Sequence, residues 1–295
     1  MTTSVGSSAT EDPARLLALS PERCAINTAT LGHREPIQIV IDRVARHGFG
    51  GIGPWRRDLE GQDVHRVARQ IQEAGLSVSG YCRSAYIPGA TSAERDAAFA
   101  ENCRAIDEAA VLGAACFVLV VGGLPAGSKD LAGARSQVED GIGRLLDRAR
   151  PVGVPLAIEP LHPMYAADRS CVTSLSEALA LCRTLDPERR EKLGVAIDAY
   201  HVWWDWRVVD GIRDAGSEER ILAFHICDWR VPTRDLLTDR GLMGEGAIDL
   251  RNLRASIEAA GYQGLAEIEI FSDELWQCDP NDMLARCVRQ VRTAC

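Results

Sequence analysis

Short apolar runs alternate with helix-like segments along nearly the whole chain, eight times over. The runs are rich in Val, Ile, Leu and Ala and predict buried strands at 24–30, 50–55, 77–83, 115–123, 154–161, 193–200, 221–229 and 264–271. The intervening segments predict helices at 36–46, 63–74, 93–112, 130–149, 174–185, 206–214, 250–260 and 281–292. Apolar strands that are each followed by a helix are typical of a parallel sheet covered by helices.

Eight such units are the number that closes a barrel. The 295 residues of the chain exceed the roughly 250 that an eight-stranded α/β barrel needs. An open, doubly wound sheet is the alternative, but no GxGxxG motif follows the first predicted strand and nothing marks a topological switch. We therefore predict an α/β fold with a single (β/α)8 TIM barrel over residues 21–295, preceded by a flexible tail at 1–20.

Composition and charge exclude several classes of protein. The net charge is −9 and no basic cluster is present, which argues against a nucleic-acid partner or an anionic membrane surface. Residues 1–20 lack the features of a secretory signal, and the longest apolar run, around 114–121, is far too short to span a membrane. The ten cysteines contain no CxxC pair, and several lie inside apolar runs, which indicates reduced thiols. We expect a cytoplasmic protein.

Metal-capable and catalytic side chains stand at the ends of the last four predicted strands. They are Glu159 and His162, then Asp198 and His201, then His225, Asp228 and Arg230, and finally Glu269. In a parallel barrel the carboxyl ends of the strands meet at one mouth, where catalytic residues lie. A carboxylate at the end of a buried strand needs a cation, a donor or water, because an unpaired buried charge costs several kcal/mol.

Three carboxylates and one imidazole in this set predict a site for one divalent metal. Glu159, Asp198 and Glu269 supply the oxygen ligands that suit Mn²⁺ or Mg²⁺, and the nitrogen of His225 also admits Co²⁺, Fe²⁺ or Zn²⁺. A cation between them would relieve the repulsion of three neighbouring carboxylates. The alternative is that each carboxylate is a separate, solvated residue of the barrel mouth.

Other residues allow two interpretations each. His162 either contacts substrate or caps its loop, and Arg230 either binds substrate or pairs with Asp228. Trp204 and Trp229 have aromatic faces suited to stacking on a sugar, or else they cover the barrel top or a subunit interface.

Two further features lie near the predicted mouth. Glu267 has the same strand parity as Glu269, but its earlier position favours a buried structural pairing. The loop at 231–249 is long enough to act as a lid.

Five sequence motifs resemble those of the xylose-isomerase-like TIM-barrel family of sugar (phosphate) isomerases and epimerases. The family also contains inosose dehydratases and endonuclease IV-type enzymes. The matching motifs are LAIEPLHP, GVAIDAYH, FHICDWRVP, GEGAIDL and GYQGLAEIEIF. They cover the second half of the chain closely, whereas the first half is similar only in its expected fold.

The resemblance implies a metal-dependent enzyme and assigns roles to residues. It makes Glu159, Asp198, His225 and Glu269 the ligands of one metal and the two glutamates the acid and base. The residues at positions 201 and 230, a histidine and an arginine, would hold substrate oxygens. In this sequence Arg230 follows His225 about one residue sooner than the corresponding arginine does in the ketose epimerases. His162 replaces another polar residue of those epimerases.

The resemblance predicts an isomerase or epimerase of a sugar or sugar derivative that acts through proton abstraction and an enediolate. The alternative is a metal-dependent lyase or dehydratase of a keto-inositol, keto-glycoside or dehydroshikimate-type substrate. A DNA-repair endonuclease fits less well, because those relatives bind several metals with more histidines than the six present here. A non-catalytic sugar-binding barrel is disfavoured because both acid/base glutamates are present. The family also implies a homodimer or homotetramer.

Overall fold

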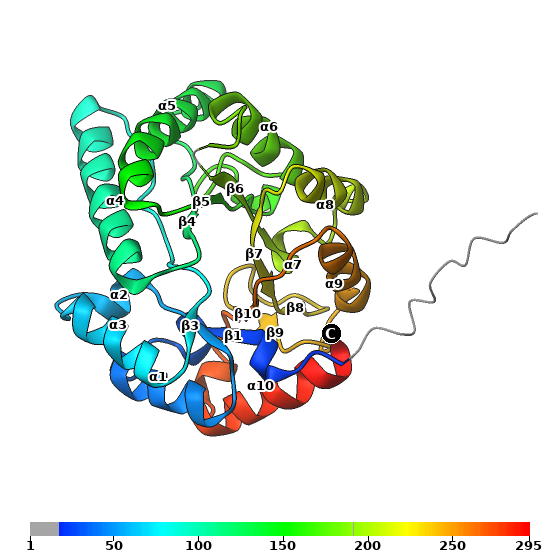
Figure 1. Cartoon of the computed structure of the whole chain (residues 1–295). Coiled ribbons are helices and arrows are strands. Elements are labelled where there is room, and N and C mark those ends of the chain that lie inside the picture. The colour runs from blue at the N-terminus through cyan, green and yellow to red at the C-terminus, as the bar shows by residue number, and fades with distance from the viewer. Residues whose placement is uncertain (1–17, 191) are drawn as a thin grey trace, which may run out of the picture.

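A parallel eight-stranded sheet lies inside a ring of helices in the computed structural model, which describes residues 18–190 and 192–295 (Figure 1). Its strands are β1 (Cys24–Asn27), β2 (Gly51–Gly53), β3 (Ser77–Val78), β4 (Phe117–Leu119), β5 (Leu156–Ile158), β6 (Leu193–Asp198), β7 (Ile221–Ile226) and β10 (Ala266–Ile268). The flexible tail predicted at 1–20 falls mostly on 1–17, outside the described residues.

The sheet closes on itself through backbone hydrogen bonds beyond its two outer strands. The strand order is β3-β2-β1-β10-β7-β6-β5-β4. Just after β3, the amide of Tyr81 donates to the carbonyl of Cys116 at 3.0 Å, and the amide of Val118 donates back to Tyr81 at 3.0 Å. These bonds join β3 to β4, so the predicted (β/α)8 barrel is confirmed.

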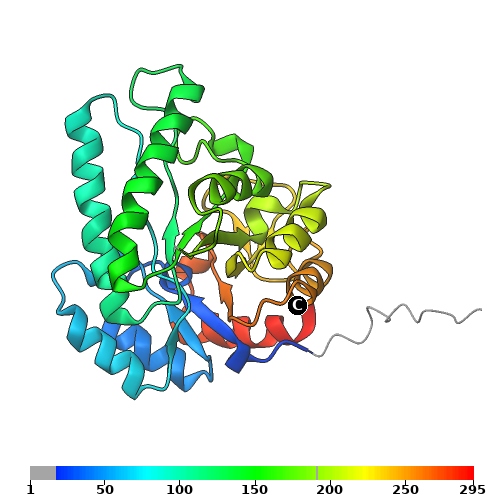
Figure 2. The same ribbon diagram turned by 45° about the horizontal axis from the view of Figure 1, so that its top comes forward.

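The helices follow the predicted alternation. They are α1 (Ile37–Arg46), α2 (Arg56–Leu59), α3 (Val64–Glu73), α4 (Ser92–Leu112), α5 (Leu131–Ala149), α6 (Leu175–Leu185), α7 (Ala199–Val202), α8 (Val208–Ser217), α9 (Leu250–Ala259) and α10 (Pro280–Ala294). Side-chain caps fix several starts, including a capping box of Thr91 and Glu94 at α4. Figure 2 shows α4 and α5 standing side by side on one flank of the barrel. No helix among the described residues is long and apolar enough to cross a membrane.

A short antiparallel ribbon interrupts the β/α pattern after β7. It pairs β8 (Asp228–Trp229) with β9 (Arg240–Gly241), so part of the predicted lid loop is a strand. The carbonyl of Leu236, in the turn of the ribbon, accepts hydrogen bonds from the hydroxyls of Tyr165 at 2.5 Å and Tyr200 at 2.9 Å. These two bonds hold the turn against the segment that follows β5 and against α7, which follows β6.

The interior of the barrel contains a buried polar layer around Glu267. This carboxylate is 1% exposed and accepts hydrogen bonds from Asn27 at 2.6 Å and from Ser79 at 2.5 Å. Gly53 provides its space, because a Cβ at that position would lie 2.3 Å from Glu267 Oε1. The side chain therefore has the buried structural pairing predicted for it.

All ten cysteines lie in the described part of the chain, and all are free thiols. Eight of them are buried, which agrees with the prediction of reduced thiols in apolar surroundings.

We predict that Gly53→Ala destabilises the protein by about 2–3 kcal/mol, because the new methyl group displaces a buried, hydrogen-bonded carboxylate. Urea denaturation measures the free energy of unfolding. Gly143→Ala is the matched control: its new Cβ would have only one neighbour, at 3.7 Å, so this substitution inside α5 should leave stability unchanged or raise it by about 0.5–1 kcal/mol. Equal effects of the two substitutions would contradict the role given to Gly53.

Candidate metal centre

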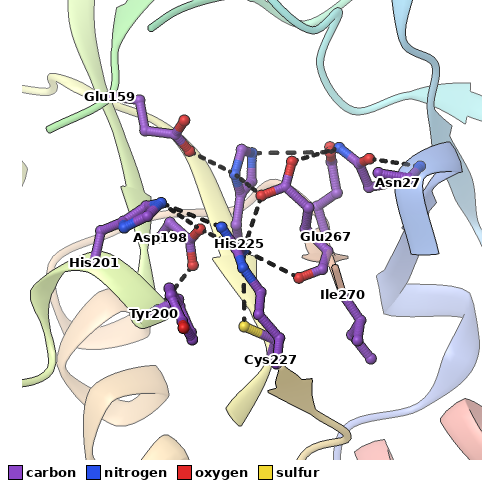
Figure 3. Close-up of polar contacts among 12 residues, drawn as sticks. Asn27, Glu159, Asp198, Tyr200, His201, His225, Cys227, Glu267 and Ile270 are labelled. Carbon is purple, nitrogen blue, oxygen red and sulfur yellow. Dashed lines mark hydrogen bonds and ion pairs between the residues drawn. The ribbon is translucent and has the colours of Figure 1, made fainter. Parts of the chain in front are cut away.

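The barrel brings together the four residues predicted to bind metal. One ligand atom from each of Glu159, Asp198, His225 and Glu269 lies within 4.8 Å of the others. Figure 3 shows the side chains of the first three converging from neighbouring strands. Each residue is at most 5% exposed. The four groups therefore form a compact, buried cluster at the carboxyl ends of β5, β6, β7 and β10.

Backbone pairing fixes the direction of each ligand. Asp198 and His225 are direct partners in the ladder between β6 and β7, so their side chains point the same way. The amides of Glu159 and Glu269 continue the ladder one residue past their strands, each donating to a neighbouring carbonyl at 3.1 Å. Asp198 also caps α7 through Oδ1, so its Oδ2 faces the cluster, where it accepts a hydrogen bond from Arg240.

The donor set fits a divalent cation. His225 Nδ1 lies 2.9 Å from Glu159 Oε1, yet neither atom forms a hydrogen bond of acceptable angle with any described residue. His225 Nε2 is likewise buried without such a partner. Buried polar atoms without hydrogen bonds are rare, and here they belong to a carboxylate and an imidazole, both common metal ligands. These residues could hold a cation through oxygen and nitrogen atoms that are otherwise unsatisfied.

Protonation equilibria at the cluster reflect its dense negative charge. Burial raises the pKa of Glu269 to about 8, even though Arg240 and His225 favour its charged form. Burial alone would lower the pKa of His225, but the carboxylates, Glu267 foremost, raise it well above the usual value. Without a cation, both groups therefore tend to keep a proton near neutral pH.

Arg240, which the sequence analysis did not identify, supplies a permanent positive charge beside the cluster. It is 3% exposed, and its Nη1 lies 2.9 Å from Asp198 Oδ2 and 3.1 Å from Glu269 Oε2. Although burial raises the pKa of Asp198, Arg240 contributes most to the opposing effect that lowers it below the usual range. The guanidinium also lies over the rings of Tyr200 and Phe271, which fix its position.

His201, which was predicted to bind substrate, lies beside Asp198. Its Nε2 is 3.6 Å from Asp198 Oδ2 and 3.2 Å from Arg240 Nη2, and its Nδ1 accepts the amide hydrogen of His162. Burial lowers the pKa of His201 to about 3, so the ring is neutral at physiological pH. A neutral imidazole can donate a hydrogen bond to a substrate hydroxyl or accept one from it.

A cavity opens above the cluster. Its lining contains Glu159, His201, Arg240 and Glu269 together with Trp55, Arg83, Tyr86, Val120, Leu161, Tyr165, Arg169, Leu237 and Phe271. The mixture of apolar and aromatic walls with a few polar groups is typical of small-molecule sites.

Four residues predicted to bind substrate lie in the described chain but do not line this cavity. His162 caps a short 3₁₀ helix, accepting the amide hydrogen of Met164, and packs between Trp204 and Trp229. Trp229 also stacks on Tyr200, at 4.6 Å between ring centroids. These contacts hold the three rings in a cluster that packs against the outside of the site.

Arg230 is held away from the cavity by acidic side chains. It pairs with Glu245 at 3.0 Å and Glu274 at 3.2 Å rather than with Asp228. Asp228 instead accepts backbone hydrogen bonds from Gly244, Gly246 and Ile248, which shape the GEG segment. The arginine that lines the cavity beside the four candidate metal ligands is Arg240, ten residues further along the chain.

Polar residues at strand ends were considered only for the last four strands, but two residues of the site stand at strand ends in the first half of the chain. Asn27 ends β1, inside the run predicted at 24–30, and donates to both Glu267 and Glu269. Arg83 ends the third run and lines the cavity. A polar residue at a strand end was therefore informative in the first half of the chain too.

Comparison with known proteins places this geometry in a family. Residues 41–291 match the family model described as "Xylose isomerase-like TIM barrel". The chain belongs to this family. Within it, the crystal structure of protein SMc04130 from Sinorhizobium meliloti 1021 is similar, with 48% identity and a TM-score of 0.89 over 93% of this chain and 98% of that one.

Other similar proteins share less sequence with the chain. A structure described as the IOLI protein with a binding zinc atom has 19% identity and a TM-score of 0.77, over 90% of this chain and 95% of that one, which shows a common fold. Inosose isomerase of Bacillus subtilis (strain 168) is 26% identical over 141 residues. That match spans 47% of this chain and 48% of the relative, so the two are alike over about half of their lengths.

We predict that metal binding releases protons and strengthens as pH rises. A divalent cation needs the ionised Glu269 and the neutral His225, and both pKa values are raised. Affinity for Mn²⁺ should therefore increase from about pH 6 to about pH 8, by about tenfold per unit for each proton displaced. Calorimetric titration in buffers of different ionisation enthalpy counts the protons released. An affinity independent of pH would contradict this arrangement.

The same linkage predicts the stability of the metal-free protein. Each group with a raised pKa makes the folded state bind its proton more tightly than the unfolded state does, so stability falls as pH rises between the ordinary and the raised pKa. The melting temperature should therefore fall from about pH 4.5 to about pH 8 because of Glu269, with a further fall above about pH 6.5 because of His225. Adding Mn²⁺ should raise the melting temperature more at about pH 8 than at about pH 6. Scanning calorimetry with and without Mn²⁺ measures both effects.

We also predict that Arg240→Gln lowers the free energy of unfolding of the metal-free protein by about 3–5 kcal/mol, because it leaves buried carboxylates without their cation. Urea denaturation provides the measurement. Arg213→Gln is the control, since Arg213 is 70% exposed in its ion pair with Asp210 and the change should cost less than about 1 kcal/mol. Similar losses for both variants would show that Arg240 has no special role.

Proposed function

We propose that the protein is a divalent-metal-dependent isomerase or epimerase of a sugar or sugar derivative. The observation that supports this most strongly is the pair of glutamates, Glu159 and Glu269, brought together with Asp198 and His225 at the base of a cavity. The names of relatives agree with the proposal: inosose isomerase among curated proteins, and a D-psicose 3-epimerase among solved structures that share the fold.

In the proposed reaction a proton moves to and from a carbon next to a carbonyl group. A cation held by the four ligands would polarise that carbonyl and stabilise the negative charge of the enediolate. One of Glu159 and Glu269 removes the proton, and the other returns it. Return to the same carbon with inversion is epimerisation, and return to the neighbouring carbon is isomerisation.

Two further residues would orient the substrate. His201, neutral and facing the cavity, would exchange a hydrogen bond with a hydroxyl group. Arg240, held at Asp198 and Glu269, would keep a positive charge beside the developing negative charge. Trp55 and Phe271 give the cavity an aromatic wall, which suits the C–H faces of a sugar ring.

We predict that Glu159→Gln and Glu269→Gln each lower turnover by about 10²–10⁴-fold, because each removes a proton-transfer group. The assay incubates keto and aldo sugars with Mn²⁺ in deuterated buffer and follows exchange at the α-carbon by NMR. Metal content is measured in parallel, so that a variant that still binds Mn²⁺ but lacks exchange reports on proton transfer alone.

Glu274→Gln is the control, because Glu274 is 56% exposed and does not line the cavity. It should retain near-native exchange. Absence of exchange across a broad panel of sugars would refute the proposal. An unsaturated carbonyl product, detected by ultraviolet absorbance, would instead establish the dehydratase.

A further inference from the structure

The outer part of the cavity has a cationic wall made of two arginines. Arg83, after β3, and Arg169, in the loop after β5, both line the cavity and are half-buried. Each guanidinium lies over a tyrosine ring that also lines the cavity: Arg83 at 4.5 Å from the ring centre of Tyr86, and Arg169 at 5.5 Å from that of Tyr165. The rings hold the charges at the cavity surface without neutralising them.

Unlike other arginines at the barrel mouth, these two have almost no carboxylate close enough to neutralise their charge. Among the described residues, no carboxylate forms an ion pair with Arg83, and Arg169 has only a loose contact of 3.9 Å with Asp168, which is 67% exposed. By contrast, Arg230 and Arg234 both pair with Asp239 and Glu274. An exposed pair such as Arg169–Asp168 contributes little, so two positive charges remain available to a ligand.

The two arginine–tyrosine pairs meet around Gly122, which follows β4. The amide of Gly122 donates to the carbonyl of Arg169 at 3.0 Å, so the two backbones are adjacent. A Cβ at Gly122 would lie 2.7 Å from the Cβ of Tyr86, so Tyr86 packs directly against the same residue. The glycine therefore leaves room for both pairs beside the same backbone segment at the cavity.

We propose that Arg83 and Arg169 form an anion subsite, so that the substrate is a sugar derivative with a carboxylate or phosphate group at the end remote from the reacting carbons. This inference rests on the proposed function for the other end of the substrate. Guanidinium groups match the planar carboxylate and the phosphate oxygens, and charge-assisted hydrogen bonds are the strongest that the cavity can offer. The subsite would select acidic sugars and fix their orientation over the two glutamates.

Calorimetric titration of the Mg²⁺-loaded protein tests the subsite without depending on turnover. The probes are D-gluconate, D-glucose 6-phosphate, D-glucose and inorganic phosphate. We expect at least one of the two acidic sugars to bind about tenfold or more tightly than D-glucose. A preference for gluconate identifies a carboxylate and a preference for the sugar phosphate identifies a phosphate. Equal binding of the acidic and neutral sugars would overturn the proposal, as would inorganic phosphate binding as tightly as the preferred acidic sugar.

Substitutions assign the preference to the two arginines. Arg83→Met and Arg169→Met should each weaken binding of the preferred acidic sugar by about 10- to 100-fold and leave D-glucose unchanged. Arg169→Lys keeps the charge and should recover part of the affinity. Arg207→Met is the matched control, because Arg207 also lies over an aromatic ring, that of Trp206, but outside the cavity. Equal weakening of all ligands would indicate a structural role and overturn the subsite.

Deuterium exchange separates this inference from the proposed function. If neutral sugars exchange as fast as acidic ones and the arginine variants behave like the native protein, the subsite is refuted and the isomerase stands. If acidic sugars bind through the arginines but no sugar exchanges, the proposed reaction is refuted while the subsite stands.

Discussion

Concentrated negative charge in a buried place is the constraint on which the site depends. The barrel satisfies each carboxylate differently. Glu267 accepts hydrogen bonds from the neutral side chains of Asn27 and Ser79 and also lies 3.8 Å from His225. Arg240 compensates Asp198 and Glu269. Glu159 and His225 remain close together with atoms that lack hydrogen bonds. This distribution explains why the fold tolerates the cluster and why one part of it is left suited to a cation.

Much of the barrel and the set of four candidate metal ligands could be predicted, because both follow from short sequence patterns. An apolar run marks a buried strand, and the first polar residue after it marks the mouth. Glu159, Asp198 and His225 obey this rule, and Glu269 follows the last strand two residues after Glu267, so their convergence follows once the strands are parallel and the barrel closes. Strand lengths were overestimated, because apolar residues continue past the last ladder bond into the buried mouth. Residues 115–123, for example, contain only the three-residue strand β4.

The parts that the sequence did not reveal depend on the path of a loop. Arg240 is 42 residues from Asp198, and the β8–β9 ribbon that carries it has no apolar periodicity to announce it. Just outside the ribbon, Arg230 pairs with Glu245, so the arginine that is nearer to His225 in the sequence is directed away from the cavity. Likewise, the cap that His162 provides to its 3₁₀ helix depends on backbone angles that its neighbours do not specify uniquely.

The placement of Arg240 on the ribbon also divides the site between two kinds of structure. The four candidate metal ligands lie in the barrel strands or one residue past them, where they are held by the buried core, whereas Arg240 lies on a two-residue strand in a loop excursion. Loops tolerate insertion and substitution far better than barrel strands do. Substitutions in this loop excursion can therefore change the charge beside the four candidate ligands without moving them. Proteins that share this barrel could acquire new substrates in this way.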